Sequence, residues 1–252
     1  MRKKHVTVLL LQTVLFLWLF HDPTHIEGNK LSATEDFFIQ GIFSADILAP
    51  PTPEGFPELK DPHWTPAYSA NELVQAVFTE AVWVFSGMIW GFAFEYTPLD
   101  KTRKVSEVFL LQQRGHIQRG SEGLLIYESS VESNTLIVNL LYYPAPHEIS
   151  EFNAWGQSPY KSSQGRAYSP AFPPIIAMQA EERVQARITA MTEAIKEAIR
   201  EYARGITYNK PRIIRGICGL LSQPRVIITS GQYLAQVTIS LHITEIISYG
   251  SY

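Results

Sequence analysis

A strongly apolar segment behind a basic one opens the chain. Three basic residues at positions 2–4 precede a run from residue 6 to residue 20 that only two threonines and a glutamine interrupt. A basic stretch followed by about 15 apolar residues is the pattern of a secretory signal. We therefore expect an exported protein, which argues against cytosolic metabolism and gene regulation as its role.

The fate of this segment depends on its length. An apolar run of about 15 residues is longer than most signal cores and shorter than the roughly 20 residues that span a bilayer. Residues 21–28 contain no convincing small-residue cleavage site, and cleavage near Gly28 is our expectation. The alternative is an uncleaved signal anchor. Residues 1–28 are thus predicted to be an export signal or a signal anchor.

A single cysteine limits how an exported chain can be stabilised. Cys218 is the only one in 252 residues, which excludes an intramolecular disulfide, a thiolate zinc site and an iron–sulfur cluster. The mature chain must rely on its apolar core, and its length can supply one. Export without disulfides favours the periplasm or cell envelope of a bacterium over eukaryotic secretion.

The net charge of −3 conceals an uneven distribution. Residues 27–100 hold 11 acidic and two basic residues, whereas residues 204–225 hold five basic residues and no acid. We expect the two parts to face each other within one fold. The alternative is a basic surface for an anionic lipid or glycan. A slightly acidic exported protein is not expected to bind nucleic acid.

Two proline-rich stretches divide the chain, at residues 50–66 and 144–174. Because proline removes a backbone donor and fixes φ, we expect neither stretch to form a regular helix or a central strand. Residues 29–66 are predicted to be an extended segment with a proline-rich linker. Residues 67–252 are predicted to form a single domain that carries a long loop at 144–174.

Helix signals mark two segments. Ser69 and Glu72 form a capping-box pattern that predicts a helix at about 70–82. Residues 178–204 show apolar side chains three and four apart, with Gly205 placed to end the helix. At 1.5 Å per residue, this second helix would be about 40 Å long.

Strand patterns occupy most of the remainder. Residues 88–96 alternate between large aromatic and small side chains, which predicts a buried central strand. Apolar runs predict further strands at 104–113, 123–128 and 135–143, and Ser230-Gly231 is a plausible hairpin turn between 225–229 and 233–244. The predicted fold is α+β, a mainly antiparallel sheet of six to eight strands covered by the two helices.

Standard catalytic motifs are absent from the sequence. The one arrangement with chemical potential is His147, Glu148 and Glu151, where His147 and Glu151 would share a helical face and Glu148 could act as a base. Two potential ligands do not make a site, so we predict no metal, no cofactor and no catalytic residue. Whether the protein is an enzyme stays open, with a non-catalytic role preferred.

The stretch at 144–174 is the predicted binding surface. Its aromatic rings alternate with cations and amides, a composition that suits contact with carbohydrate, lipid or protein. The alternative is that the rings cover the edge of the core. The candidate binding residues are Trp155, Tyr160, Lys161, Arg166 and Tyr168.

Three functions are compatible with these patterns. The first is a non-catalytic envelope module that binds a ligand or partner through residues 144–174. The second is a hydrolase of an envelope polymer that uses Glu148 or Glu151 with His147. The third is a membrane-anchored assembly factor that keeps residues 6–20 as its anchor.

Overall fold

A computed structural model of the chain describes residues 37–47, 69–118, 120–132, 135–171 and 180–249. The apolar segment at 6–20, the expected cleavage point at Gly28 and the proline-rich stretch at 50–66 lie outside the described residues.

Helices and strands are segregated rather than alternating, and the predicted α+β class is confirmed. The described residues contain nine strands in two antiparallel sheets, where one sheet of six to eight strands was predicted. The elements are β1 (Ile39–Asp46), α2 (Ala70–Ile89), β2 (Phe92–Thr97), β3 (Val108–Gln113), β4 (Leu124–Glu132), β5 (Thr135–Tyr142), α3 (Pro146–Ala154), β6 (Lys161–Tyr168), α4 (Ala180–Ile206), β7 (Ile213–Leu220), β8 (Arg225–Thr229) and β9 (Gln232–Ile247).

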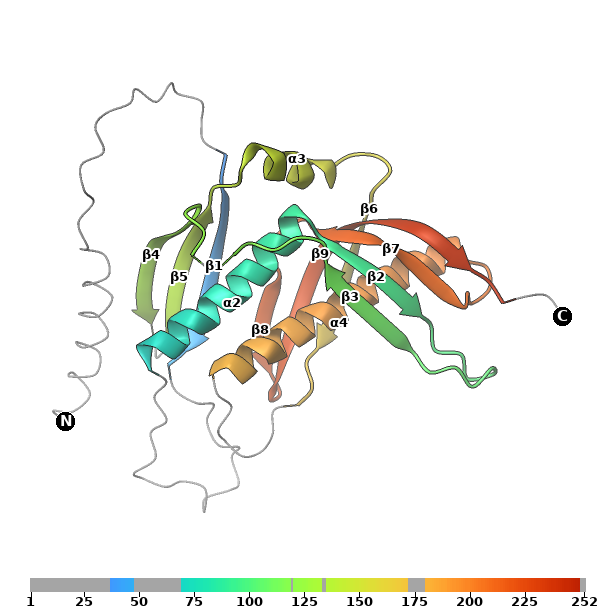
Figure 1. Ribbon diagram of the computed structural model, residues 1–252. Coiled ribbons are helices and arrows are strands. Elements are labelled where there is room, and N and C mark those ends of the chain that lie inside the picture. Colours follow the sequence, from blue (N-terminus) through green and yellow to red (C-terminus); the bar gives the residue numbers. More distant parts are fainter. Residues whose placement is uncertain (1–36, 48–68, 119, 133–134, 172–179, 250–252) are drawn as a thin grey trace, which may run out of the picture.

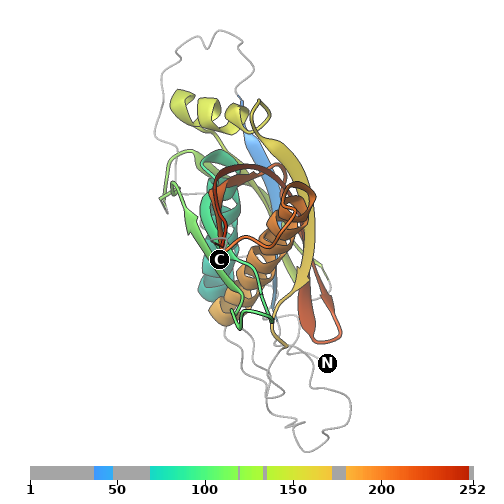
Figure 2. The same ribbon diagram turned by 90° about the vertical axis from the view of Figure 1, so that its right-hand side faces the viewer.

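The smaller sheet has the strand order β1-β5-β4, and the larger has the order β3-β2-β7-β9-β6, with β8 paired to β9. Figure 1 shows the smaller sheet at one end of the molecule and the larger sheet at the other, with α2 lying across the smaller sheet and α4 along the larger one. Helix α4 packs on β6 and β9, and α2 packs on α4, β1 and β7. Figure 2 looks along this arrangement and shows the two helices enclosed by strands.

Helix α2 begins as predicted and ends later than predicted. Ser69 Oγ accepts from the Glu72 amide at 3.2 Å, and Glu72 Oε2 accepts from the Ser69 amide at 2.7 Å, which confirms the capping box. The helix continues to Ile89 instead of 82 because Gly91, with φ of +68°, is the residue that turns the chain. The predicted strand at 88–96 therefore starts only at Phe92.

Helix α2 is also apolar enough to raise the question of a membrane span. Among the described residues it is the one helix with the length and composition to cross a bilayer, and 67% of its most apolar window is buried inside the protein. We therefore assign it as a core helix.

The long helix and the C-terminal hairpin agree closely with prediction. Helix α4 covers Ala180–Ile206, against an expected 178–204, and Gly205 lies inside the helix instead of ending it. Strands β8 and β9 meet at Ser230 and Gly231, whose φ values of 51° and 70° are those of a type I′ turn.

The prediction of a long loop at 144–174 is wrong. The segment holds helix α3, which has proline at its first turn, and the eight-residue strand β6. Strand β6 was not predicted from the sequence because it has almost no large apolar residue. The side chains on its inner face are small because α4 packs closely there: a Cβ at Gly165 would collide with the backbone of Ala194 and Ala198.

Candidate binding surface

Trp155, the largest of the predicted binding residues, lies in the core. Its side chain is 4% exposed, its ring packs against Gly91 and Gly219, and its Nε1–H donates to the Ile89 carbonyl at 3.0 Å. Its own carbonyl accepts from the Ser240 hydroxyl at 2.6 Å. Trp155 is therefore the ring that covers the core edge, as the alternative interpretation allowed.

Strand β6 separates the other four predicted residues. Ser163 Oγ donates to the Ala198 carbonyl at 2.8 Å, so odd-numbered residues of β6 face α4. Lys161 belongs to that inner face, while Arg166 and Tyr168 point the other way and are exposed. Tyr160, just before the strand, contacts the Trp155 ring at a tilted angle and the His242 ring edge-on, with centroid distances of 4.9 and 6.1 Å.

Side chains from three neighbouring strands line up on this outer side. Tyr168 of β6 is opposite Leu234 of β9, which is opposite Ile227 of β8. The next row is Arg166, Gln236 and Arg225, and beyond it Gln164 is opposite Thr238. We call this surface the β6–β9–β8 face and define it by Gln164, Arg166, Tyr168, Arg225, Ile227, Leu234, Gln236 and Thr238.

The β6–β9–β8 face is basic and partly apolar. Tyr168 is 51% exposed and Ile227 is 42% exposed, whereas Leu234 between them is 4% exposed. None of its eight residues is acidic, and neither Arg166 nor Arg225 makes an ion pair within the described part of the chain. With strands about 4.8 Å apart, the two arginines are separated by roughly 10 Å across Gln236. This spacing suits an extended anion or a row of anionic groups.

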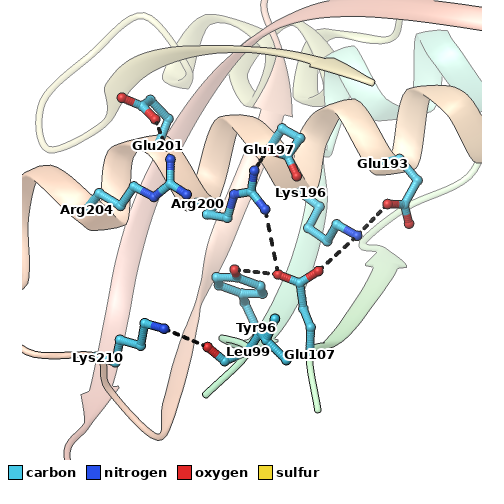
Figure 3. A network of polar contacts seen from close by, with 10 residues as sticks. All are labelled: Tyr96, Leu99, Glu107, Glu193, Lys196, Glu197, Arg200, Glu201, Arg204 and Lys210. Carbon is cyan, nitrogen blue, oxygen red and sulfur yellow. Dashed lines mark hydrogen bonds and ion pairs between the residues drawn. The ribbon is translucent and has the colours of Figure 1, made fainter. Parts of the chain in front are cut away.

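The cations of α4 that Figure 3 draws are, by contrast, paired with neighbouring carboxylates. Glu107 accepts from the Tyr96 hydroxyl at 2.8 Å and lies 3.4 Å from Lys196 Nζ. Lys196 also pairs with Glu193, and Arg200 pairs with Glu197. This cluster holds three carboxylates and two cations, so it offers no attraction to an external anion.

Cations of the basic segment at 204–225 also have partners within the protein. Arg215 pairs with Glu95 at 2.7 Å and with Glu245 at 2.8 Å, which confirms that acidic and basic parts face each other there. Arg204 pairs with Glu201 at 3.2 Å, and Lys210 donates to the Leu99 carbonyl at 2.9 Å. Arg225 is the member of that segment that joins the β6–β9–β8 face.

The acid–base group that the sequence suggested, formed by His147, Glu148 and Glu151, does not assemble in the structure. The Glu148 side chain is buried and accepts from the Tyr142 hydroxyl at 2.9 Å and from the Ala145 amide at 2.7 Å, capping α3. Burial, and then Glu148, raise the pKa of Tyr142 to about 12. His147 and Glu151 are exposed, and no three potential ligands gather around a metal position within the described ranges. Glu148 does line an open cavity of about 290 Å³ with His116 and Ser121.

A second cavity, of about 240 Å³, lies where α2, α4, β1 and β8 meet. Its polar side is an ion-pair network. Arg187 contacts Glu80 through two hydrogen bonds of 2.6 and 2.9 Å, and its guanidinium lies 5.4 Å from the Tyr233 ring centroid. Arg183 pairs with Asp46 and donates to the Tyr233 hydroxyl at 3.2 Å. Because these four charges cancel, the network holds the two helices and β1 together.

Cys218 plays no chemical part. It is fully buried, and burial raises the pKa of its thiol well above the ordinary range. Cys218 is therefore a core packing residue.

Sequence reasoning missed Ile227 and Gln236, and it placed Arg225 only within the basic segment at 204–225. A two-residue turn at Ser230-Gly231 sets the register of the hairpin, so the pairing of Arg225 with Gln236 could have been predicted locally. The addition of β6 on the other side of β9 could not, since it joins residues about 70 positions apart.

Comparison with known proteins identifies a family for this chain but no activity. The sequence model of one protein family of unknown function matches residues 32–249. The chain belongs to this family. A similar relative is an uncharacterised protein of Treponema pallidum (strain Nichols), 23% identical over 195 residues that make up 77% of this chain and 75% of the relative. No solved structure matches significantly.

Proposed function

We propose that the protein is an exported, non-catalytic module of the bacterial cell envelope that binds an anionic partner through the β6–β9–β8 face. The observation that carries this proposal is the pair of arginines, Arg166 and Arg225, that share an exposed row with Gln236 and have no acidic neighbour on the face. Of the residues predicted from sequence to bind, the face retains Arg166 and Tyr168.

The chemistry of the face explains why an anion is the preferred partner. Two guanidinium groups about 10 Å apart attract negative charge and can make charge-assisted hydrogen bonds to carboxylate, phosphate or sulfate oxygens. The neighbouring Tyr168 and Ile227 offer an apolar row to the same partner. Export rests on residues 1–28, and retention of residues 6–20 as an anchor would keep the domain at a membrane.

The hydrolase alternative receives less support from the geometry. Glu148 is buried and held by Tyr142 and by the first turn of α3, whereas His147 and Glu151 are exposed to solvent. The family assignment and the relative from Treponema name no reaction.

Removal of both arginines should weaken binding of anionic probes. We expect the full chain to bind phosphatidylglycerol vesicles or poly-L-glutamate, and Arg166→Ala combined with Arg225→Ala to reduce the affinity about tenfold. This follows from roughly 0.2–1 kcal/mol for each exposed ion pair and 1.4 kcal/mol for each factor of ten. Co-flotation and calorimetric titration at 50 and 300 mM salt would measure both effects, since screening should weaken binding further.

Arg212→Ala is the matched control, because Arg212 is an exposed arginine immediately before β7, beyond the end of β9 that is far from β6. It should bind both probes as the wild type does. Failure of the wild type to bind either probe, or equal losses in the control and in the double variant, would contradict the proposal.

A further inference from the structure

Strand β6 forms one edge of the larger sheet, and its free side is an uninterrupted row of backbone groups. The strand is eight residues long, has no proline inside it and pairs with β9 without a bulge. An open edge of this length is a template on which another strand can form, and most proteins protect such edges.

The backbone groups that face outward can be identified. The Ser169 amide donates to the Tyr233 carbonyl at 2.8 Å, and the Thr238 carbonyl accepts from Leu221 on the far side of β9 at 2.9 Å. Because hydrogen-bonded and non-hydrogen-bonded pairs alternate along an antiparallel ladder, both contacts place the same set of β6 residues on the open side. That set is Ser162, Gln164, Arg166 and Tyr168.

Of the other edges, three are closed, interrupted or uncharged, and β8, which pairs with β9, is only five residues long. Gln223 covers the free side of β1 by exchanging two hydrogen bonds with Ile42, of 3.0 and 2.6 Å. Strand β4 is interrupted by a bulge between Ile126 and Glu128. Strand β3 is open but carries no charged residue. Among these edges, β6 therefore combines an open ladder with an unpaired cation, Arg166.

We propose that the partner is an extended acidic polypeptide segment that adds as a strand to the free edge of β6. Its backbone would pair with Ser162, Gln164, Arg166 and Tyr168, and its acidic side chains on the outer side would approach Arg166. In strand addition the main chain supplies affinity, and alternate side chains supply specificity. This inference rests on the proposed function and narrows it from an anionic partner to a polypeptide.

Selection from a phage-displayed library of random twelve-residue peptides on the full chain would test the inference. We expect enrichment of peptides with Asp or Glu at alternate positions. A synthetic copy of an enriched peptide should slow hydrogen exchange at the amides of Ser162, Gln164, Arg166 and Tyr168. Its affinity should fall at least tenfold in Gln164→Pro, which removes an outward-facing donor, and about two- to fivefold in Arg166→Ala, which removes the charge.

Arg212→Ala is again the control and should bind the peptide normally. Hydrogen exchange at the inward amides of β6 shows whether Gln164→Pro still folds, and Arg166→Ala tests the inference without altering the backbone. No enrichment, enrichment without acidic residues, or unchanged exchange at the four amides would overturn it. Arginine-dependent binding of phosphatidylglycerol vesicles without peptide enrichment would leave the proposed function standing and refute strand addition, whereas loss of both would refute both.

Discussion

Trp155→Ala should lower the free energy of unfolding by about 3–5 kcal/mol, the cost of truncating a fully buried aromatic side chain. The indole packs on Gly91 and Gly219 and donates to the Ile89 carbonyl, so its removal leaves a cavity and an unpaired acceptor at the end of α2. For a chain of this size, each kcal/mol changes Tm by about 2–4 °C, and calorimetry should show a decrease of roughly 10 °C.

Two companion variants separate packing from binding. Trp155→Phe keeps most of the apolar contact and should lose less stability than the alanine variant. Tyr168→Ala, at a half-exposed position of the β6–β9–β8 face, should change stability by less than about 1 kcal/mol. A Trp155→Ala protein as stable as the wild type but defective in binding would return Trp155 to the binding surface and contradict its place in the core.

Glu80→Gln should cost a similar amount, about 3–5 kcal/mol, because it leaves a buried guanidinium without its counter-ion. Burial acts to lower the pKa of Arg187, and Glu80, with smaller contributions from Tyr233 and Asp46, raises it above the ordinary value. The guanidinium therefore stays charged, and the neutral amide cannot compensate that charge. Urea unfolding of the two proteins would measure the difference.

The double variant Glu80→Leu with Arg187→Met is the control for this effect. It replaces the whole pair by apolar side chains of similar volume, and its stability should return to within about 1–2 kcal/mol of the wild type, since a buried ion pair contributes little net stability. A single Glu80→Gln variant with wild-type stability would show that the pair is solvated and that the contact between α2 and α4 does not depend on it.

Local patterns predicted the elements whose stabilising contacts lie close in sequence. Helix α4 has an apolar stripe and complementary terminal charges, and the β8–β9 hairpin has a turn that only a few residue pairs can form. Helix α2 was predicted at its capped start, whereas its end depends on where Gly91 reverses the chain and on burial against α4 and β7.

Proline counting misled the interpretation of 144–174, because Pro146 occupies a helix position that tolerates proline. Strand β6 has the polar composition of a loop, and its small inner face makes sense only beside α4, which lies outside any local window. For the same reason, the burial of Trp155 against Gly91 and Gly219 could not be read from its neighbours in sequence. Arg166 and Tyr168 were predicted to bind because the segment around them mixes aromatic and basic side chains. The register of β6 on β9 is what places them beside Arg225 and Ile227.

The most direct test of the central claim is site-specific photocrosslinking of the full chain in the cells that produce it. A p-benzoyl-phenylalanine side chain at Gln236 occupies the middle of the β6–β9–β8 face, and the same group at Arg212 lies beyond the far end of β9. The account predicts a crosslinked adduct from position 236 that disappears when Arg166 and Arg225 are both replaced by alanine, and no such adduct from position 212. No adduct from position 236, or equal adducts from both positions, would contradict it.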